Sequence, residues 1–244
     1  DRLSRFWKGL FPAVVAVGAV SSFVVLEDLG TGVLMAAAAG VVLVAAGARL
    51  WQFALFIPFG LLGVVAAILQ NPYRMDRIVA FLNPYADPQH TGFHMIQSMA
   101  TVAGGGFTGR GLGHGLQKFG YLPEDQTDFL FAIICEELGV AGALFVLALY
   151  ALLAWTMLAI VRRERSTLLR LGALGIIATF TLQASINLMV VTGLGPTKGI
   201  ALPLLSAGGT GWILTAASLG LLVAIDRRDA RVDHGEPSLA AVAT

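Results

Sequence analysis

The sequence predicts an all-α polytopic membrane protein, a bundle of about six transmembrane helices with a long outer loop carrying short amphipathic helices. Of its 244 residues, 57% are hydrophobic and 13% are charged, and the mean hydropathy is +0.78. Soluble domains have about 45–50% apolar and about 25% charged residues, so a soluble globule is excluded. The apolar stretches lack the period-two alternation of membrane β-strands, which excludes a β-barrel.

Six stretches approach the roughly 20 apolar residues that a helix needs to cross a bilayer. They cover residues 9–26, 31–48, 51–69, 129–160, 168–191 and 209–225. We expect the first to stay in the mature chain, because no small-residue cleavage site separates it from the second. Residues 1–226 are therefore expected to form a single multispan domain. Residues 227–244 mix charge with Gly, Pro, Ser and Ala, which predicts a disordered cytoplasmic tail.

The basic residues predict the orientation of these spans. Eleven of the sixteen Lys and Arg residues lie before the first span, between the second and third, between the fourth and fifth, or after the sixth. By the positive-inside rule this side faces the cytoplasm. Both termini are then expected inside, and segments 27–30, 70–128 and 192–208 outside.

Net charge and cysteine content exclude further classes of protein. Nucleic-acid-binding domains carry a clustered basic excess, so a net charge of +1 predicts no nucleic-acid partner. Cys135 is the single cysteine, which rules out an intrachain disulfide or a cysteine metal cluster. Three histidines have no recognisable zinc-site spacing and are expected to be loop residues: His90, His94 and His114.

Residues 70–128 form a connection much longer than the usual two to eight or so residues between helices, and such loops are commonly functional. Arg74 to Leu82 is amphipathic, with Arg77 on its polar side, and is expected to lie in the membrane interface. A second helix is expected from His90 or Thr91 to Val102. Glycines then alternate at Gly109, Gly111, Gly113 and Gly115. Because no strand precedes them, they are not a dinucleotide fingerprint; they either let backbone amides approach another group or permit tight turns.

Acidic residues gather where this loop enters the fourth span. Asp128 is either a helix cap or a functional acid. Glu136 and Glu137 lie within the span, where ionisable residues are by default functional or paired. In a continuous helix, Glu136 would lie about 12 Å below Asp128 and could support the same groove or hold a cation there.

Several motifs resemble the SEDS family of bacterial cell-wall polymerases. They are the strings at residues 122–132, 136–139, 195–199 and 203–209. Gln117-Lys118 and Pro196-Thr197-Lys198-Gly199 look more like the division branch of the family than the elongation branch. Similarity runs from about Phe11 to Asp226, and the six spans correspond to the later ones of the ten that are usual in the family. The chain is therefore expected to be a fragment or split product of a longer protein, or an unusually short member.

The resemblance implies an enzyme of the bacterial cytoplasmic (inner) membrane that polymerises lipid II into glycan strands on the outer leaflet during cell division. It also implies a class B penicillin-binding protein transpeptidase and other divisome proteins as partners, besides the surrounding membrane lipids. By position, Asp128 matches the family's catalytic aspartate, and Glu124 matches the acid just before it. Lys198 and Ser206 match the family's outer loop between the last two spans.

Glycan polymerisation needs a base for a sugar hydroxyl and positive charge for a departing lipid pyrophosphate. Asp128 is expected to be the base, because partial desolvation raises a carboxyl pKa towards the useful range. The other residues expected to bind substrate are Lys198, Arg77, Lys118, Glu124, Ser206 and Glu136. Arg77 and Lys118 could equally anchor lipid headgroups. We also expect a divalent cation, Mg²⁺ or Mn²⁺, bridged by carboxylates and phosphates, and no organic cofactor.

Two alternatives stay open at this point. A lipid II flippase would need a polar path through the membrane, for which the candidates are Glu136, Glu137, Gln183 and Asn187. The ionisable residues cluster towards the outer side, whereas Gln183 and Asn187 are neutral and typical of hydrogen bonds between helices, which favours the polymerase. The other alternative is a catalytically inactive scaffold that recruits a divisome partner.

Overall fold

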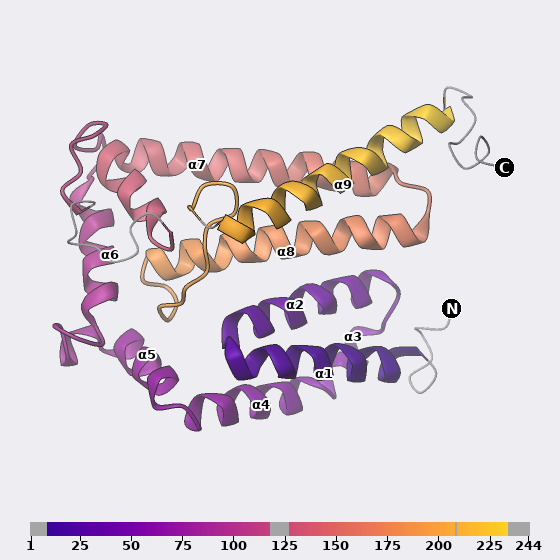
Figure 1. Cartoon of the computed structure of the whole chain (residues 1–244), viewed down its shortest axis with the longest axis horizontal. Coiled ribbons are helices and arrows are strands. Elements are labelled where there is room, and N and C mark those ends of the chain that lie inside the picture. The colour runs from indigo at the N-terminus through magenta and orange to yellow at the C-terminus, as the bar shows by residue number, and fades with distance from the viewer. Residues whose placement is uncertain (1–8, 118–126, 208, 234–244) are drawn as a thin grey trace.

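The computed structural model describes residues 9–117, 127–207 and 209–233, and every regular element in these ranges is a helix (Figure 1). The predicted all-α membrane bundle is thereby confirmed. The apolar helices are α1 (Phe11–Glu27), α2 (Leu29–Ala45), α3 (Leu50–Ala54), α4 (Ile57–Leu69), α7 (Leu130–Arg163), α8 (Thr167–Val191) and α9 (Gly209–Asp233).

Four segments of the described chain are long and apolar enough to cross a membrane: Leu50–Leu69, Leu130–Arg163, Thr167–Val191 and Gly209–Arg228. The other two predicted spans, α1 and α2, are apolar helices of 17 residues each, at the lower end of the length that a bilayer requires. Large apolar side chains on these helices are exposed, including Phe23, Phe59, Trp155 and Ile213. The chain is a multi-pass membrane protein.

The third predicted span is not one continuous helix. α3 ends at Ala54 and α4 begins at Ile57, with Pro58 in its first turn. Proline has no amide hydrogen, so Pro58 cannot donate the hydrogen bond to Ala54 that would continue the helix. Proline thus explains a break that the apolar composition hides.

The long outer loop contains the two short helices that were expected. α5 (Pro72–Leu82) begins after Asn71, whose side chain accepts a hydrogen bond from the Tyr73 amide at 3.1 Å. A 3₁₀ turn, η2 (Pro84–Ala86), follows at the second Asn-Pro pair. α6 (Phe93–Gly104) then leads into a glycine-rich segment.

The two ends of the bundle differ in composition. In Figure 1 the α2–α3 connection, the α7–α8 turn and the end of α9 lie on the right, where most of the described basic residues of the predicted inner side are found. The α1–α2 turn, α5, α6 and the α8–α9 loop lie on the left. All described parts of the predicted outer side are therefore gathered at one end.

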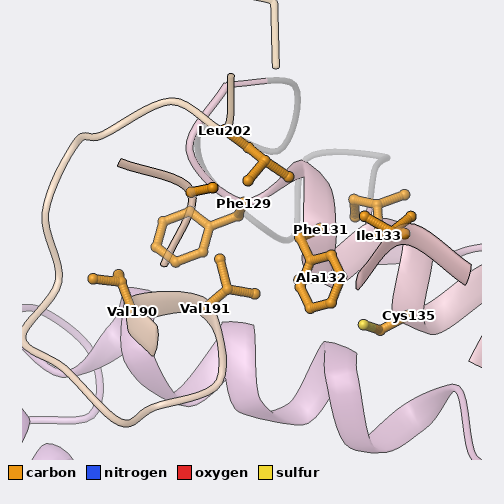
Figure 2. Close-up of a cluster of buried hydrophobic side chains, with 10 residues drawn as sticks. Phe129, Phe131, Ala132, Ile133, Cys135, Val190, Val191 and Leu202 are labelled. Atoms are coloured by element: carbon orange, nitrogen blue, oxygen red, sulfur yellow. The ribbon is translucent and has the colours of Figure 1, made fainter. Parts of the chain in front are cut away.

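Two clusters of buried apolar side chains hold the bundle together. The cluster at the outer end joins α7, α8 and the α8–α9 loop, and Figure 2 shows Phe129 lying between Val190, Val191 and Leu202. The second cluster joins α7, α8 and α9 towards the opposite end, around Phe180 and Leu222. Asp128 immediately precedes Phe129, so the packing of Phe129 in the outer cluster helps to fix the position of the Asp128 backbone.

α7 is broken at Gly139, where φ is 64° and ψ is −158°. This backbone conformation is essentially restricted to glycine, and a Cβ atom there would also collide with the backbone of Phe107 and Gly109. The predicted fourth span, residues 129–160, is therefore not one straight helix. Figure 1 shows the short outer part of α7 turned away from the line of its long part.

α9 continues to Asp233, so residues 227–233 of the predicted disordered tail are helical. The remainder of that predicted tail, residues 234–244, lies outside the described residues.

Candidate active site

A cavity of about 350 Å³ opens at the outer end of the bundle. It is lined by Tyr73, Asp76, Arg77, His90, Thr91, His94, Asp128, Phe129, Thr197, Lys198 and Gly199. These residues come from α5, from the segment leading into α6 and its first turn, from the residues before α7, and from the α8–α9 loop. The fold thus brings three of the predicted site residues, Asp128, Lys198 and Arg77, to one cavity.

Asp128 lies at the cavity wall and is partly exposed. Asn187 of α8 donates a hydrogen bond from its side-chain amide to the backbone oxygen of Asp128, at 2.7 Å. On the facing loop, a Cβ atom at Gly199 would lie 2.9 Å from the Asp128 carboxylate, so only glycine admits the carboxylate there without adjustment. The N-cap of α7 is Phe129, so neither Asp128 nor Thr127 occupies the capping position.

Lys198 pairs with an acid that lies far from it in the sequence. Its ammonium is 2.9 Å from a carboxylate oxygen of Asp28, the residue between α1 and α2. The lysine side chain crosses Gly30, where any Cβ atom would overlap it. The sequence predicted that Lys198 binds substrate, and its pairing with Asp28 was not anticipated.

The pKa values of both partners depart from their ordinary values. Burial lowers the pKa of Lys198 below its ordinary 10.5, and Asp28 opposes this shift while Arg77 and Arg74 add to it. Partial burial works to raise the pKa of Asp28, but hydrogen bonds from Thr31 and Lys198 outweigh it and lower that pKa below 3.8. Asp28 therefore stays ionised near neutral pH and helps Lys198 to keep its charge.

Arg77 lies beside Lys198 and is held on two sides. It donates a hydrogen bond to the Thr197 backbone oxygen at 3.0 Å, and its guanidinium lies over the Tyr73 ring, 4.5 Å from the centroid. One turn earlier, Arg74 donates to the backbone oxygens of Val25 and Leu26 at 2.8 Å. These contacts fix α5 against both the α8–α9 loop and the end of α1.

Glu136 and Glu137 do not line this cavity. They hold the glycine loop, residues 105–117, against the outer part of α7. Glu137 accepts hydrogen bonds from the amides of Gly113 and Gly115, at 3.0 and 3.3 Å. Glu136 is 1% exposed; it accepts from the amides of Leu116 and Gln117 and forms an ion pair with Arg110 at 3.4 Å.

The loop glycines serve both purposes considered from the sequence. Gly109, Gly111 and Gly113 have positive φ, so they form turns that other residues adopt only with strain. At Gly109 a Cβ atom would also collide with the Glu137 backbone, so this glycine lets two backbones approach closely. The expected role of Glu136 in holding substrate or cation stays untested, and its observed partners belong to the loop.

Ser206 also lies outside the cavity lining. It is 2% exposed, and its hydroxyl accepts a hydrogen bond from the Leu202 amide at 2.8 Å, closing a turn of the α8–α9 loop. Gln183 of α8 donates to the Ala201 backbone oxygen of the same loop, at 2.9 Å. Two further predicted site residues, Lys118 and Glu124, lie outside the described residues.

The cavity contains residues that the sequence reasoning left aside. His90 and His94 line it, and the His94 ring stacks on Phe129 with centroids 6.3 Å apart. Asp76 is a second carboxylate in the lining. The sequence could have indicated Asp76, because it directly precedes Arg77 in the predicted amphipathic helix. The histidines carried no signal beyond their place in the outer loop.

A divalent cation would find few protein ligands here. No cluster of three or more His, Cys, Asp or Glu side chains suited to a metal occurs among the described residues. Asp76 and Asp128 are the two carboxylates of the cavity lining. Mg²⁺ commonly binds through one or two carboxylates together with substrate phosphates, so the lining fits a cation that arrives with a phosphorylated substrate.

Comparisons with known proteins agree with the motifs. A family model described as "Cell cycle protein" and covering FtsW, RodA and SpoVE matches residues 1–231. Stage V sporulation protein E of Bacillus subtilis (strain 168) is 42% identical over 228 residues, 92% of this chain and 62% of that protein. A probable peptidoglycan glycosyltransferase FtsW of Geobacter sp. (strain M18) is 38% identical over 229 residues, 93% of this chain and 62% of that protein.

A solved structure shares the fold. It is described as "Structural coordination of polymerization and crosslinking by a peptidoglycan synthase complex"; the likeness has a TM-score of 0.74 at 27% identity and covers 94% of this chain and 64% of that one. The chain thus spans about three fifths of the length of the relatives it matches. Because the family model covers nearly all of it, the chain belongs to the FtsW, RodA and SpoVE family of cell cycle proteins.

Proposed function

We propose that this chain carries the active site of a peptidoglycan glycosyltransferase that polymerises lipid II at the outer face of the cytoplasmic membrane during cell division. The observation that carries the proposal is the cavity where a carboxylate, Asp128, meets two cations, Lys198 and Arg77. Relatives described as probable peptidoglycan glycosyltransferases support the same reaction class.

The reaction forms a bond between a sugar hydroxyl oxygen and the anomeric carbon of a second, lipid-linked sugar. It breaks the bond from that carbon to the pyrophosphate, which leaves with the bonding electrons. Asp128 takes the hydroxyl proton, and its place in the lining of the cavity favours this role. Lys198 and Arg77 stabilise the negative charge of the departing pyrophosphate.

The flippase alternative has less support. Four polar residues were candidates for its path, and all have partners elsewhere. Glu136 and Glu137 accept hydrogen bonds from the glycine loop, while Gln183 and Asn187 donate theirs to backbone oxygens of Ala201, Asp128 and Ile200. No specific observation favours transport.

We further propose that the outer end, as defined by α5, α6 and the α8–α9 loop, faces away from the cytoplasm. Cysteine substitutions in a Cys135→Ser background test this orientation. A cysteine at position 114 should react with a membrane-impermeant reagent in intact cells, whereas one at position 165 should be protected. The reverse pattern would refute the orientation.

A class B penicillin-binding protein is the proposed transpeptidase partner. The similar solved structure is described as a complex that coordinates polymerization and crosslinking, which supports this assignment. Other divisome proteins and surrounding membrane lipids complete the proposed surroundings. Co-purification from membranes with a class B penicillin-binding protein, compared with an unrelated multi-pass protein of similar size, would test the association.

A divalent cation held by Asp76, Asp128 and the substrate pyrophosphate is also part of the proposal. When bound, it would add positive charge at the leaving group. Chelation by EDTA followed by addition of Mg²⁺ or Mn²⁺ tests the requirement: activity that survives complete chelation would contradict it.

The central experiment is polymerisation of purified lipid II. The chain is assayed in nanodiscs alone, and together with the part of the Bacillus subtilis relative that the alignment leaves unmatched. Long glycan strands in either arm support the glycosyltransferase. An absence of strands in both arms, with correctly folded protein that still binds a transpeptidase, would favour the inactive scaffold instead.

A further inference from the structure

We infer that Asn187 is a positioning residue that fixes the base against the cations of the site. This inference rests on the proposed function for its meaning in catalysis. Asn187 lies in α8, outside the cavity lining, and is 2% exposed. It touches none of the reacting groups directly, and its effect passes through the backbone that carries them.

The amide group of Asn187 joins two segments that are distant in the sequence. Its nitrogen donates one hydrogen bond to the backbone oxygen of Asp128 and another to that of Ile200, both at 2.7 Å. The Ile200 amide donates to the Lys198 backbone oxygen at 2.9 Å. A single side chain thus connects the Asp128 segment to the tight turn that presents Lys198.

The chemistry of the amide suits this task. An amide nitrogen offers two hydrogens, and here both meet carbonyl oxygens of different segments. The site is buried, so water does not compete for these bonds, and an unpaired carbonyl would cost about 1–3 kcal/mol. A carboxylate at position 187 has no hydrogen to donate, so its oxygens would repel the two carbonyl oxygens. An aliphatic side chain would leave both carbonyls without this donor.

The two connected segments are in close contact, so small displacements matter. The Asp128 carboxylate lies 2.9 Å from the position a Cβ atom would take at Gly199, between Lys198 and Ile200. If either backbone shifted by about 1 Å, the distance between base and cation would change enough to reduce turnover up to about a hundredfold. Asn187 holds that distance.

Gln183 provides a matched control on the same helix. It lies four residues before Asn187, and its side-chain amide also donates to the α8–α9 loop, at Ala201, with a length of 2.9 Å. Unlike the pair of hydrogen bonds from Asn187, the hydrogen bond from the Gln183 side chain reaches that loop alone. A general weakening of the loop should therefore result from either substitution, whereas separation of Asp128 from Lys198 should result only from the change at Asn187.

The test compares Asn187→Leu with Gln183→Met in the full chain, in the lipid II assay that supports wild-type activity. Asn187→Leu should lower kcat at least about tenfold with KM within about threefold, while Gln183→Met should lower kcat less than about threefold. Equal losses in the two variants, or wild-type kcat in folded Asn187→Leu protein, would overturn the inference.

A second measurement needs no substrate. Hydrogen–deuterium exchange of the folded variants should show faster exchange in both 127–133 and 198–202 for Asn187→Leu. For Gln183→Met the increase should be confined to 198–202. If wild-type protein proves inactive on lipid II, the proposed function fails, but this measurement still decides whether Asn187 joins the two segments. Unchanged exchange at 127–133 in Asn187→Leu would refute it.

Discussion

The cavity at the outer end and the glycine loop lie at the same end of the molecule, and both contain carboxylates, but these carboxylates have different surroundings. In the cavity, Asp128 borders open volume together with Lys198 and Arg77. In the glycine loop region, Glu136 and Glu137 accept hydrogen bonds from four backbone amides.

This difference shows that the surrounding backbone decides what an acid near the membrane can do. Glycines 109, 111 and 113, with their positive φ, let the loop turn its amides towards Glu136 and Glu137. Carboxylates occupied in this way hold structure. Asp128 precedes its helix and lines a cavity, which is the setting that the proposed role as a base requires.

The largest expected effect concerns Asp128. Asp128→Asn keeps the shape of the side chain but removes the base, so the rate of glycan synthesis should fall about a thousandfold. Because Phe129 occupies the N-cap position, the thermal midpoint in detergent should stay close to wild type. Substantial synthesis by the folded variant would show that Asp128 is not the base.

The corresponding change in the glycine loop region should act on stability. Glu136→Ala removes the acceptor of two amides and the partner of Arg110, which should lower the free energy of unfolding by about 3 kcal/mol. Unfolding by SDS in mixed micelles measures this loss, with the exposed Glu27→Ala as control. A raised KM at unchanged stability would instead support the predicted role of Glu136 in binding substrate.

An intermediate effect is expected at Lys198. Lys198→Met removes the cation and should lower kcat/KM for lipid II at least about tenfold, equivalent to about 1.4 kcal/mol. Lys198→Arg should retain part of the activity, because the charge survives in a different geometry. If Lys198 only anchors headgroups or pairs with Asp28, turnover per folded molecule will be unchanged while stability falls.

The smallest effect should be a shift in pH dependence. Burial lowers the pKa of Lys198 and Asp28 opposes this, so Asp28→Asn should lower that pKa further. A lysine loses its charge as the pH rises through its pKa, so the alkaline limb of kcat/KM should move to lower pH. Asn caps α2 about as well as Asp, so the fold should persist. If the alkaline limb of kcat/KM does not move, the ionisation of Lys198 does not determine it.

The sequence predicted much of the fold because apolar length and amphipathic spacing are local properties. α5, with Arg77 on its polar side, and α6 were expected close to where they occur. The break at Gly139 was not expected, because its cause is contact with Phe107 and Gly109, about thirty residues earlier in the chain. An isolated glycine within an apolar run carries no such information.

The site was predicted where sequence motifs and topology mark its residues, and it was missed where it depends on contacts between distant segments. The topology placed Lys198 and Asp128 on the same side, and the motifs singled out both. The Lys198–Asp28 pair joins segments 170 residues apart, and its signal was only that both lie on the predicted outer side. The hydrogen bonds of Asn187 to two backbone oxygens could not be predicted from its residue type, because neutral amide side chains are common between membrane helices.

The break in α7 has a consequence for how the protein adapts to bilayers of different thickness. The part from Val140 to Arg163 is about 36 Å long at 1.5 Å per residue, more than the roughly 30 Å of a hydrocarbon core. Helices longer than the core tilt to match it. Because Gly139 separates this part from the residues that follow Asp128, a change of tilt in the long part need not alter the depth of the carboxylate at the membrane surface.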